Sequence, residues 1–366
     1  MDNTSSAICA GREPTCAHGR RLVSDRVYVG TADGSVRAIA VPSLRDDVRR
    51  PSDAELPLMR VYWSARLCIH AITNVCGVDT DVKHTDTLLV GSAGGELVVL
   101  REELEVRRFQ LEGGVQDICY TGNGVFMVGD ALGNLYCVTQ YEILWKQRLP
   151  AIVDAGNDAG LDFFYPAATQ PIVYAIAQVR LLDVERTLSN YVLVASGHKH
   201  VVVTHCGKTF AAIPTRTPMT TLAVFPGKDE DIVLAAGEEG LIYRLVSNRD
   251  VVSNEMPDFR FAMEVWVKTS FPVMKLLSVP TPSKVNVSEI AWVCLGSNGE
   301  VALFRGQECV RTWEAASFST ARSAAADFPV DLTLLASGDA SDVRQSGVIV
   351  FRDRIHTFPI DLMGQQ

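Results

Sequence analysis

The chain has 366 residues, and its 34 Lys and Arg against 43 Asp and Glu give a formal net charge of −9. With 47% apolar and 21% charged residues, the composition is that of a folded protein rather than a disordered one. The acidic balance argues against general binding to nucleic acid or to an anionic membrane surface, because both need a basic protein surface.

Seven copies of one short pattern follow one another along the chain. Each copy has two to four apolar residues, a glycine, a few small or polar residues, a turn and an alternating apolar run, and each is typical of a β-hairpin. The copies span residues 27–41, 88–100, 125–138, 191–204, 232–246, 290–304 and 334–351.

Further apolar segments flank these hairpins. Segments such as VQDICYTG and MTTLAVF precede a hairpin, and segments such as EVRRFQL and RIHTFPI follow one, which makes four strands per unit. The first glycines of the first and last copies, Gly30 and Gly338, enclose six intervals of about 51 residues on average, as in the blades of propellers. The sequence therefore predicts an all-β fold: a seven-bladed β-propeller of four-stranded antiparallel blades, since radial closure removes exposed edges.

The uneven spacing of the copies predicts the domain organisation. Residues 1–20 are expected to form a flexible N-terminal tail, and residues 21–366 a single propeller with insertions near 42–57, 151–190 and 247–264. Only residues 20–24 are available as a strand before the first hairpin. We therefore expect a segment distant in sequence to complete one blade, with the N-terminal region pairing with or packing against the C-terminal blade.

Strong catalytic and phosphate-binding motifs are absent from the sequence, so no cofactor and no catalytic residue is predicted. His198, His200, His205 and Cys206 form the densest group of possible metal ligands, but a hairpin tip explains them better. Cys9, Cys16 and His18 form a similar weak trio. No metal site is predicted at either place.

Two other sets of residues have structural interpretations. Trp63, Trp145 and Trp313 fall near the final strands of their units, where an aromatic side chain packs between adjacent sheets. Asp229, Glu230 and Asp231 lie in a polar connection and are interpreted as a solvated turn without a basic companion.

The segment 125–151, VFMVGDALGNLYCVTQYEILWKQRLPA, resembles the repeats of quinoprotein-type propellers. The hairpins lack the Gly-His and Trp-Asp signatures of WD40 repeats, so the likeness to WD40-like propellers is weaker. Over residues 88–246, the order of LLVGSAGGELVVL, the VGD…GNLYCV hairpin, EILWKQRLPA and IVLAAGEEGLIYRLV is similar to the propeller of Bardet-Biedl syndrome (BBSome) subunits. This resemblance implies a propeller-only relative acting in a ciliary or trafficking assembly, and it carries over no catalytic residue.

The favoured function is a non-catalytic protein–protein interaction scaffold, a subunit of a larger eukaryotic complex whose partners are other protein subunits. One alternative is a propeller enzyme or a small-ligand or peptide binder with its site at the mouth of the central channel. Another is a reader of basic protein tails.

No apolar run approaches the roughly 20 residues of a membrane helix, and the N-terminus lacks a secretory apolar core. A cytoplasmic location, ciliary or flagellar in particular, is expected, with nine cysteines acting as buried free thiols.

Leu161, Phe163, Phe164 and Tyr165 lie in the longest predicted insertion and are the candidate partner-binding residues. If they anchor a partner, replacing Phe163 and Phe164 with Ser abolishes partner binding and leaves the melting temperature unchanged. If they cover their own blade instead, the same change lowers the melting temperature. Thermal unfolding measured beside a binding assay separates the two.

Overall fold

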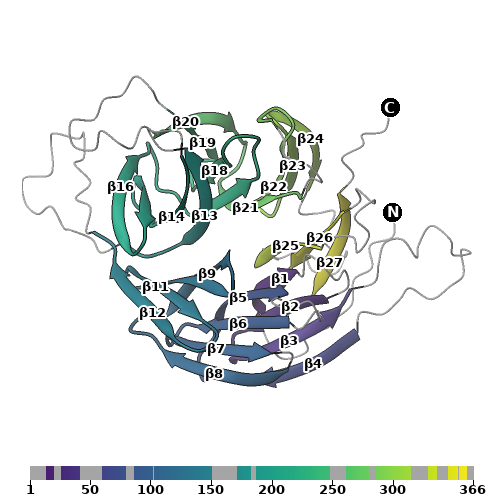
Figure 1. Ribbon diagram of the computed structural model, residues 1–366. Helices are drawn as coiled ribbons and strands as arrows, with labels where there is room; N and C mark the ends of the chain where they lie inside the picture. Colours follow the sequence, from purple (N-terminus) through teal and green to yellow (C-terminus); the bar gives the residue numbers. More distant parts are fainter. Residues whose placement is uncertain are drawn as a thin grey trace, which may run out of the picture.

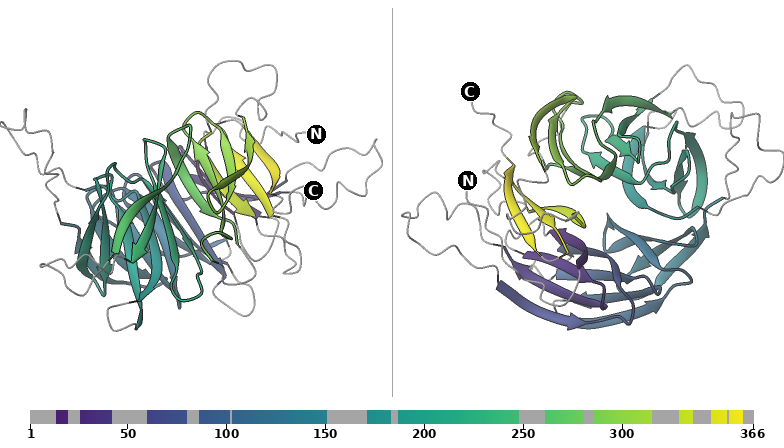
Figure 2. Two further views of the ribbon diagram at one scale, coloured as in Figure 1. Left: turned by 90° about the horizontal axis from the view of Figure 1, so that it is seen from above. Right: turned by 180° about the vertical axis from the view of Figure 1, so that it is seen from behind.

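The computed structural model describes residues 14–19, 26–41, 60–79, 86–101, 103–150, 171–182, 187–247, 261–280, 286–314, 329–335, 345–352 and 354–360. These residues form seven antiparallel sheets that follow one another around a centre (Figures 1 and 2). The predicted seven-bladed all-β propeller is confirmed. Within the described ranges there is no helix, and hence no helix that could cross a membrane.

Blades 1 to 3 occupy the N-terminal part of the chain. Blade 1 contains β1 (Pro14–Gly19), β2 (Arg26–Thr31), β3 (Ser35–Ala40) and β4 (Arg60–Arg66). Blade 2 contains β5 (Ile72–Asp79), β6 (Asp86–Ser92), β7 (Glu96–Arg101) and β8 (Leu104–Gln110). Blade 3 contains β9 (Val115–Gly122), β10 (Val125–Asp130), β11 (Asn134–Thr139) and β12 (Ile143–Arg148).

Blades 4 to 7 complete the ring. Blade 4 contains β13 (Ala175–Leu182), β14 (Leu188–Ala195), β15 (His200–His205) and β16 (Lys208–Pro214), and blade 5 contains β17 (Thr221–Phe225), β18 (Ile232–Ala236), β19 (Leu241–Ser247) and β20 (Phe261–Lys268). Blade 6 contains β21 (Val273–Ser278), β22 (Ala291–Gly296), β23 (Val301–Arg305) and β24 (Glu308–Trp313). Blade 7 has three strands among the described residues: β25 (Asp331–Leu335), β26 (Gln345–Val350) and β27 (Ile355–Ile360).

The first strand of each blade borders the centre, as β1, β5, β9, β13, β21 and β25 show in Figure 1. These inner strands run in one direction, so all of them begin on one face of the ring, here called the start face, and finish on the other, the end face. The turns between second and third strands lie on the start face, because the second strand is antiparallel to the first.

The first glycine of the repeat is explained by close packing between blades. A Cβ atom on Gly30 would lie 2.5 Å from Ile72 of the next blade, and one on Gly91 would lie 2.3 Å from Val115. A Cβ atom on Gly129 would lie 2.2 Å from Val173. These distances are far below van der Waals contact. The repeat therefore needs glycine at the positions where the chain passes close by on its way into the next blade.

The flanking strands predicted from VQDICYTG, MTTLAVF and EVRRFQL are confirmed as β9, β17 and β8, and the outermost strands share an unpredicted feature. Each of the six fourth strands contains a β-bulge, and the bulged residue is apolar in every case: Tyr62, Val106, Leu144, Phe210, Trp266 and Val310. A bulge distorts the free edge of the strand and so opposes pairing with another chain. β27 pairs with β26 without a bulge and is largely buried, like the third strands of the other blades.

The three tryptophans pack between sheets, as predicted. Trp63 joins the apolar cluster between blades 1 and 2, Trp145 the cluster between blades 3 and 4, and Trp313 the cluster between blades 6 and 7.

The expected N-terminal tail of residues 1–20 is wrong over residues 14–19, which form β1, the inner strand of blade 1. Ala17 packs with Val27 of its own blade and with Leu335 and Val348 of blade 7. The expected packing of the N-terminal region against the C-terminal blade is therefore confirmed. Blade 1, however, is completed by its own consecutive strands and not by a distant segment.

Three other boundaries need correction. The predicted insertion 151–190 contains β13 and the start of β14, and the predicted insertion 247–264 contains the start of β20. The predicted insertion 42–57 lies entirely outside the described residues. The seventh repeat copy forms the first and second strands of its blade, whereas the other six form the second and third. Local pattern could not reveal this shift, because both kinds of hairpin have the same alternation.

Replacing Gly129 with Ala should destabilise the protein by about 1–3 kcal/mol, since the new methyl group overlaps Val173. In the double variant with Val173→Ala, the two losses should be less than additive, because the second change removes the nearest clashing atom. Chemical denaturation of the four proteins measures this coupling. Strict additivity would contradict close packing at this joint.

Candidate functional site

The predicted partner-binding residues Leu161, Phe163, Phe164 and Tyr165 lie outside the described residues. The structure offers two other places where polar side chains from different blades meet. One lies at the start face around the central channel, and the other is a pocket on the end face.

At the start face, two carboxylates each accept hydrogen bonds from a neighbouring blade. Asp117 on β9 accepts from the backbone N–H of Ile176 on β13 at 2.6 Å and from Nδ2 of Asn74 on β5 at 2.9 Å. It thus joins blades 2, 3 and 4. The sequence analysis did not single out Asp117, because nothing in the segment VQDICY distinguishes a residue that links blades from an exposed residue.

The second carboxylate closes the ring. Asp331 at the start of β25 accepts from the backbone N–H of Ala17 on β1 at 2.8 Å and forms an ion pair with Nζ of Lys275 on β21. One side chain therefore links blades 6, 7 and 1, the first and last parts of the chain included.

Lys275 is central to the electrostatics of the channel. Burial raises the pKa of Asp117 to about 6, while its backbone hydrogen bonds and the charge of Lys275 lower it. Burial, and then the charge of Asp331, raise the pKa of Cys16 to about 12, and Lys275 again lowers it. Lys275 lies on the inner strand β21 and pairs with Asp331 of blade 7, and its charge also acts on Asp117 of blade 3 and Cys16 of blade 1.

The possible metal ligands do not come together. His198 and His200 lie at the start of β15, whereas His205 and Cys206 lie at its other end, where His205 packs on Tyr191. Cys16 is a buried thiol, and Cys9 lies outside the described residues. Over the described part of the chain, no three His, Cys, Asp or Glu side chains gather as a metal site would require.

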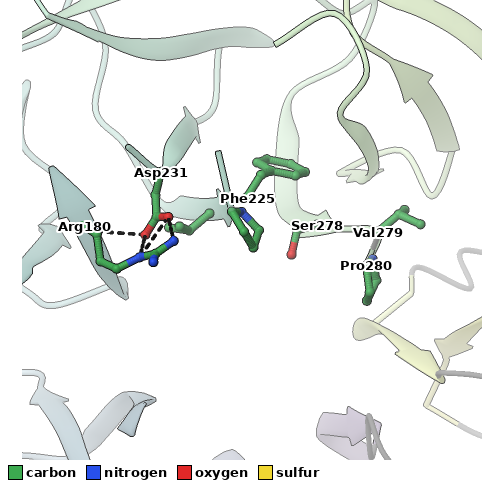
Figure 3. Close-up of a pocket in the computed structure, with 8 residues that line it drawn as sticks. Arg180, Phe225, Asp231, Ser278, Val279 and Pro280 are labelled. Atoms are coloured by element: carbon green, nitrogen blue, oxygen red, sulfur yellow. Dashed lines mark hydrogen bonds and ion pairs between the residues drawn. The ribbon is translucent and has the colours of Figure 1, made fainter. Parts of the chain in front are cut away.

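The end-face pocket has a volume of about 360 Å³ and lies between blades 4, 5 and 6 (Figure 3). Its described walls are largely apolar and rich in proline. They consist of Arg180, Val224, Phe225, Pro226, Asp231, Ser278, Val279 and Pro280. This volume falls within the range of sites that hold small molecules or single peptide side chains.

The polar side of this pocket is a fixed ion pair. Nη2 of Arg180 donates to Asp231 at 2.6 Å, and Nε donates to the same carboxylate at 3.2 Å. The backbone N–H of Arg180 also donates to this carboxylate at 2.8 Å, and the backbone N–H of Asp231 donates to the carbonyl of Arg180 at 2.9 Å. The hydrogen bond to Asp231 raises the pKa of Arg180 above its ordinary value. Nη1 makes none of these bonds.

The interpretation of Asp231 as a solvated turn residue is therefore wrong. Its side chain is only 9% exposed, and its companion, Arg180, lies 51 residues earlier in the sequence. A pairing at that distance leaves no local signal. The described lining residues include no histidine or cysteine beside Ser278, and their one carboxylate, Asp231, is paired with Arg180.

No protein-family model and no curated protein matches the chain. Among solved structures, the chain is similar to BBS1N in its crystal structure with ARL6DN: the mercury-soaked crystal gives a TM-score of 0.63 at 11% identity, covering 100% of this chain and 98% of that chain. The lead-soaked crystal gives 0.64 at 10% identity, with 99% and 97% covered. The WD40 β-propeller domain of Doa1 gives 0.61 at 12% identity, with 97% and 96% covered. At these identities the likeness shows a shared propeller fold.

Replacing Lys275 with Met should raise the pKa of Asp117 further above about 6, because it removes the cation that lowers it. A carboxyl pKa that folding raises contributes most to stability below its unfolded value, and the contribution falls as pH rises through the folded value. The variant should therefore lose more stability than the wild type as the pH rises from about 4 to 7. Carboxyl carbon shifts and denaturation at several pH values measure both effects.

Lys268→Met is the matched control, since Lys268 ends β20 on an outer strand. It should leave the Asp117 titration unchanged. An unchanged Asp117 pKa in Lys275→Met would contradict the action of the Lys275 charge on Asp117.

Proposed function

We propose that this chain is a non-catalytic scaffold that presents its faces and rim to other protein subunits of a larger eukaryotic complex. The supporting observation is the use of the polar groups at the channel. Asp117 and Asp331 are engaged in hydrogen bonds between blades, and Lys275 is paired with Asp331. Groups that hold the ring together are poorly placed to carry a proton or attack a substrate.

One solved protein of similar fold, BBS1N, supports a role in protein binding. BBS1N is crystallised in complex with ARL6DN, so a propeller of this architecture binds a protein partner. We extend that use to this chain, in a BBSome-like ciliary or trafficking assembly located in the cytoplasm or cilium. The end-face pocket would receive one side chain of such a partner, with an apolar part against Phe225 and Pro280 and an oxygen on Arg180.

A second candidate function is the binding of a small ligand at the channel mouth. The observation in its favour is the convergence of Asp117, Asp331 and Lys275, which would suit a ligand carrying both an amine and an acid group. Replacing Asp331 with Asn separates the two functions: a ligand site would lose affinity, and a scaffold would keep its partners provided that it stays folded.

Purification of the tagged full chain under native conditions should recover it with stoichiometric protein partners, and the tagged protein should localise to the cilium of a ciliated cell. Size-exclusion chromatography followed by mass spectrometry measures the first, and microscopy the second. Recovery as a lone protein with hydrolase or oxidoreductase activity would overturn the scaffold.

A further inference from the structure

The outer strands of blades 2 and 3 are basic in an acidic protein. β8 carries Arg107, Arg108 and Glu105, and β12 carries Lys146 and Arg148, which leaves three net positive charges on two strands of a chain whose net charge is −9. By contrast, β20 and β24 each carry one cation and one anion, whereas β4 is also basic, with Arg60 and Arg66 and no carboxylate. The two basic strands are neighbours on the lower rim in Figure 1.

Cations of the two strands lie on sides that face each other. The guanidinium of Arg107 lies over the ring of Phe109, 5.7 Å from its centroid, and Phe109 packs against the apolar cluster between blades 2 and 3. Nζ of Lys146 lies 5.9 Å from the ring centroid of Tyr136, which belongs to the same cluster. Lys146 also pairs with Glu112 at 2.5 Å, and Arg108 pairs with Glu96 at 3.0 Å and with Glu105 at 2.8 Å, so Arg107 is the cation that we expect a partner to contact.

Apolar side chains are exposed beside these charges. Leu104 is 73% exposed, and the bulged residues Val106 and Leu144 are 40% and 50% exposed. Ile143 pairs with Val138, a member of the cluster between the blades, and is partly exposed on that side. Exposed aliphatic groups next to cations are a composition typical of protein-binding surfaces.

We propose that the outer strands of blades 2 and 3, the blade 2–3 rim, bind an acidic segment of a partner protein that also carries aliphatic or aromatic side chains. This inference rests on the proposed scaffold function and names its partner chemistry. An acidic segment is repelled by a chain of net charge −9 on average, so we expect it to bind where Arg107 lies beside exposed apolar side chains. The bulges at Val106 and Leu144 oppose strand addition, so recognition uses side chains.

The test uses a fluorescein-labelled peptide of about 12 alternating Glu and Leu residues, with fluorescence anisotropy as the readout. The full chain should bind it, and the Arg107→Glu/Lys146→Gln variant should bind about tenfold or more weakly, with an unchanged melting temperature. Arg311→Glu is the matched control, because Arg311 lies over Trp313 on β24 as Arg107 lies over Phe109 on β8. It should bind like the wild type, and a peptide with Gln in place of Glu should not bind.

Equal loss in Arg311→Glu would overturn the proposal, since any cation would then serve. No binding of the Glu–Leu peptide, equal binding of the Gln–Leu peptide, or tighter binding to anionic lipid vesicles than to the peptide would each overturn it as well. Native purification distinguishes this failure from failure of the scaffold itself. If equal amounts of partner protein are recovered with wild type and with Arg107→Glu, only the rim proposal is rejected. If no partner is recovered with either protein, the scaffold function itself is rejected.

Discussion

The propeller depends on how closely each inner strand approaches the blade before it. At Gly30, Gly91 and Gly129 the second strand has no side chain, and Ile72, Val115 and Val173 occupy that space. The apolar clusters therefore run from one blade into the next instead of lying within single sheets. A single sheet of this kind cannot bury both of its faces, so each blade is stable only beside its neighbours.

A second set of joints is polar and runs around the start face. Thr73 donates from Oγ1 to the carbonyl of Val115 at 2.5 Å, and Thr221 accepts from the backbone N–H of Leu276 at 3.0 Å. Asp117 and Asp331 make equivalent joints with carboxylates. Backbone groups at the inner strands would otherwise lack partners in a crowded interior, which costs about 1–3 kcal/mol for each group. The charges in the channel thus have a structural cause before any ligand is considered.

The parts of the fold that sequence could predict are those set by short-range pattern. The hairpins and their flanking strands follow from alternation and turn residues. β1 was missed because PTCAHG has no apolar alternation, and its position is fixed by Asp331 and by blade 7, more than 300 residues away. The Arg180–Asp231 pair and the bulges were missed for a similar reason, since each depends on the strand or blade that lies alongside.

The same division separates structure from recognition. Interior polar groups are committed to neighbouring blades, so the protein partner that we propose would contact the side chains that remain at the faces and the rim. On the rim, the bulges protect the free edges from adding strands, and they do so by turning apolar residues such as Val106 and Leu144 outward. The β-bulges, which oppose non-specific pairing at the strand edges, therefore also leave apolar side chains exposed and available for contact with a partner. Where basic residues accompany them, as on β8 and β12, the rim recognition that we propose would gain selectivity from charge.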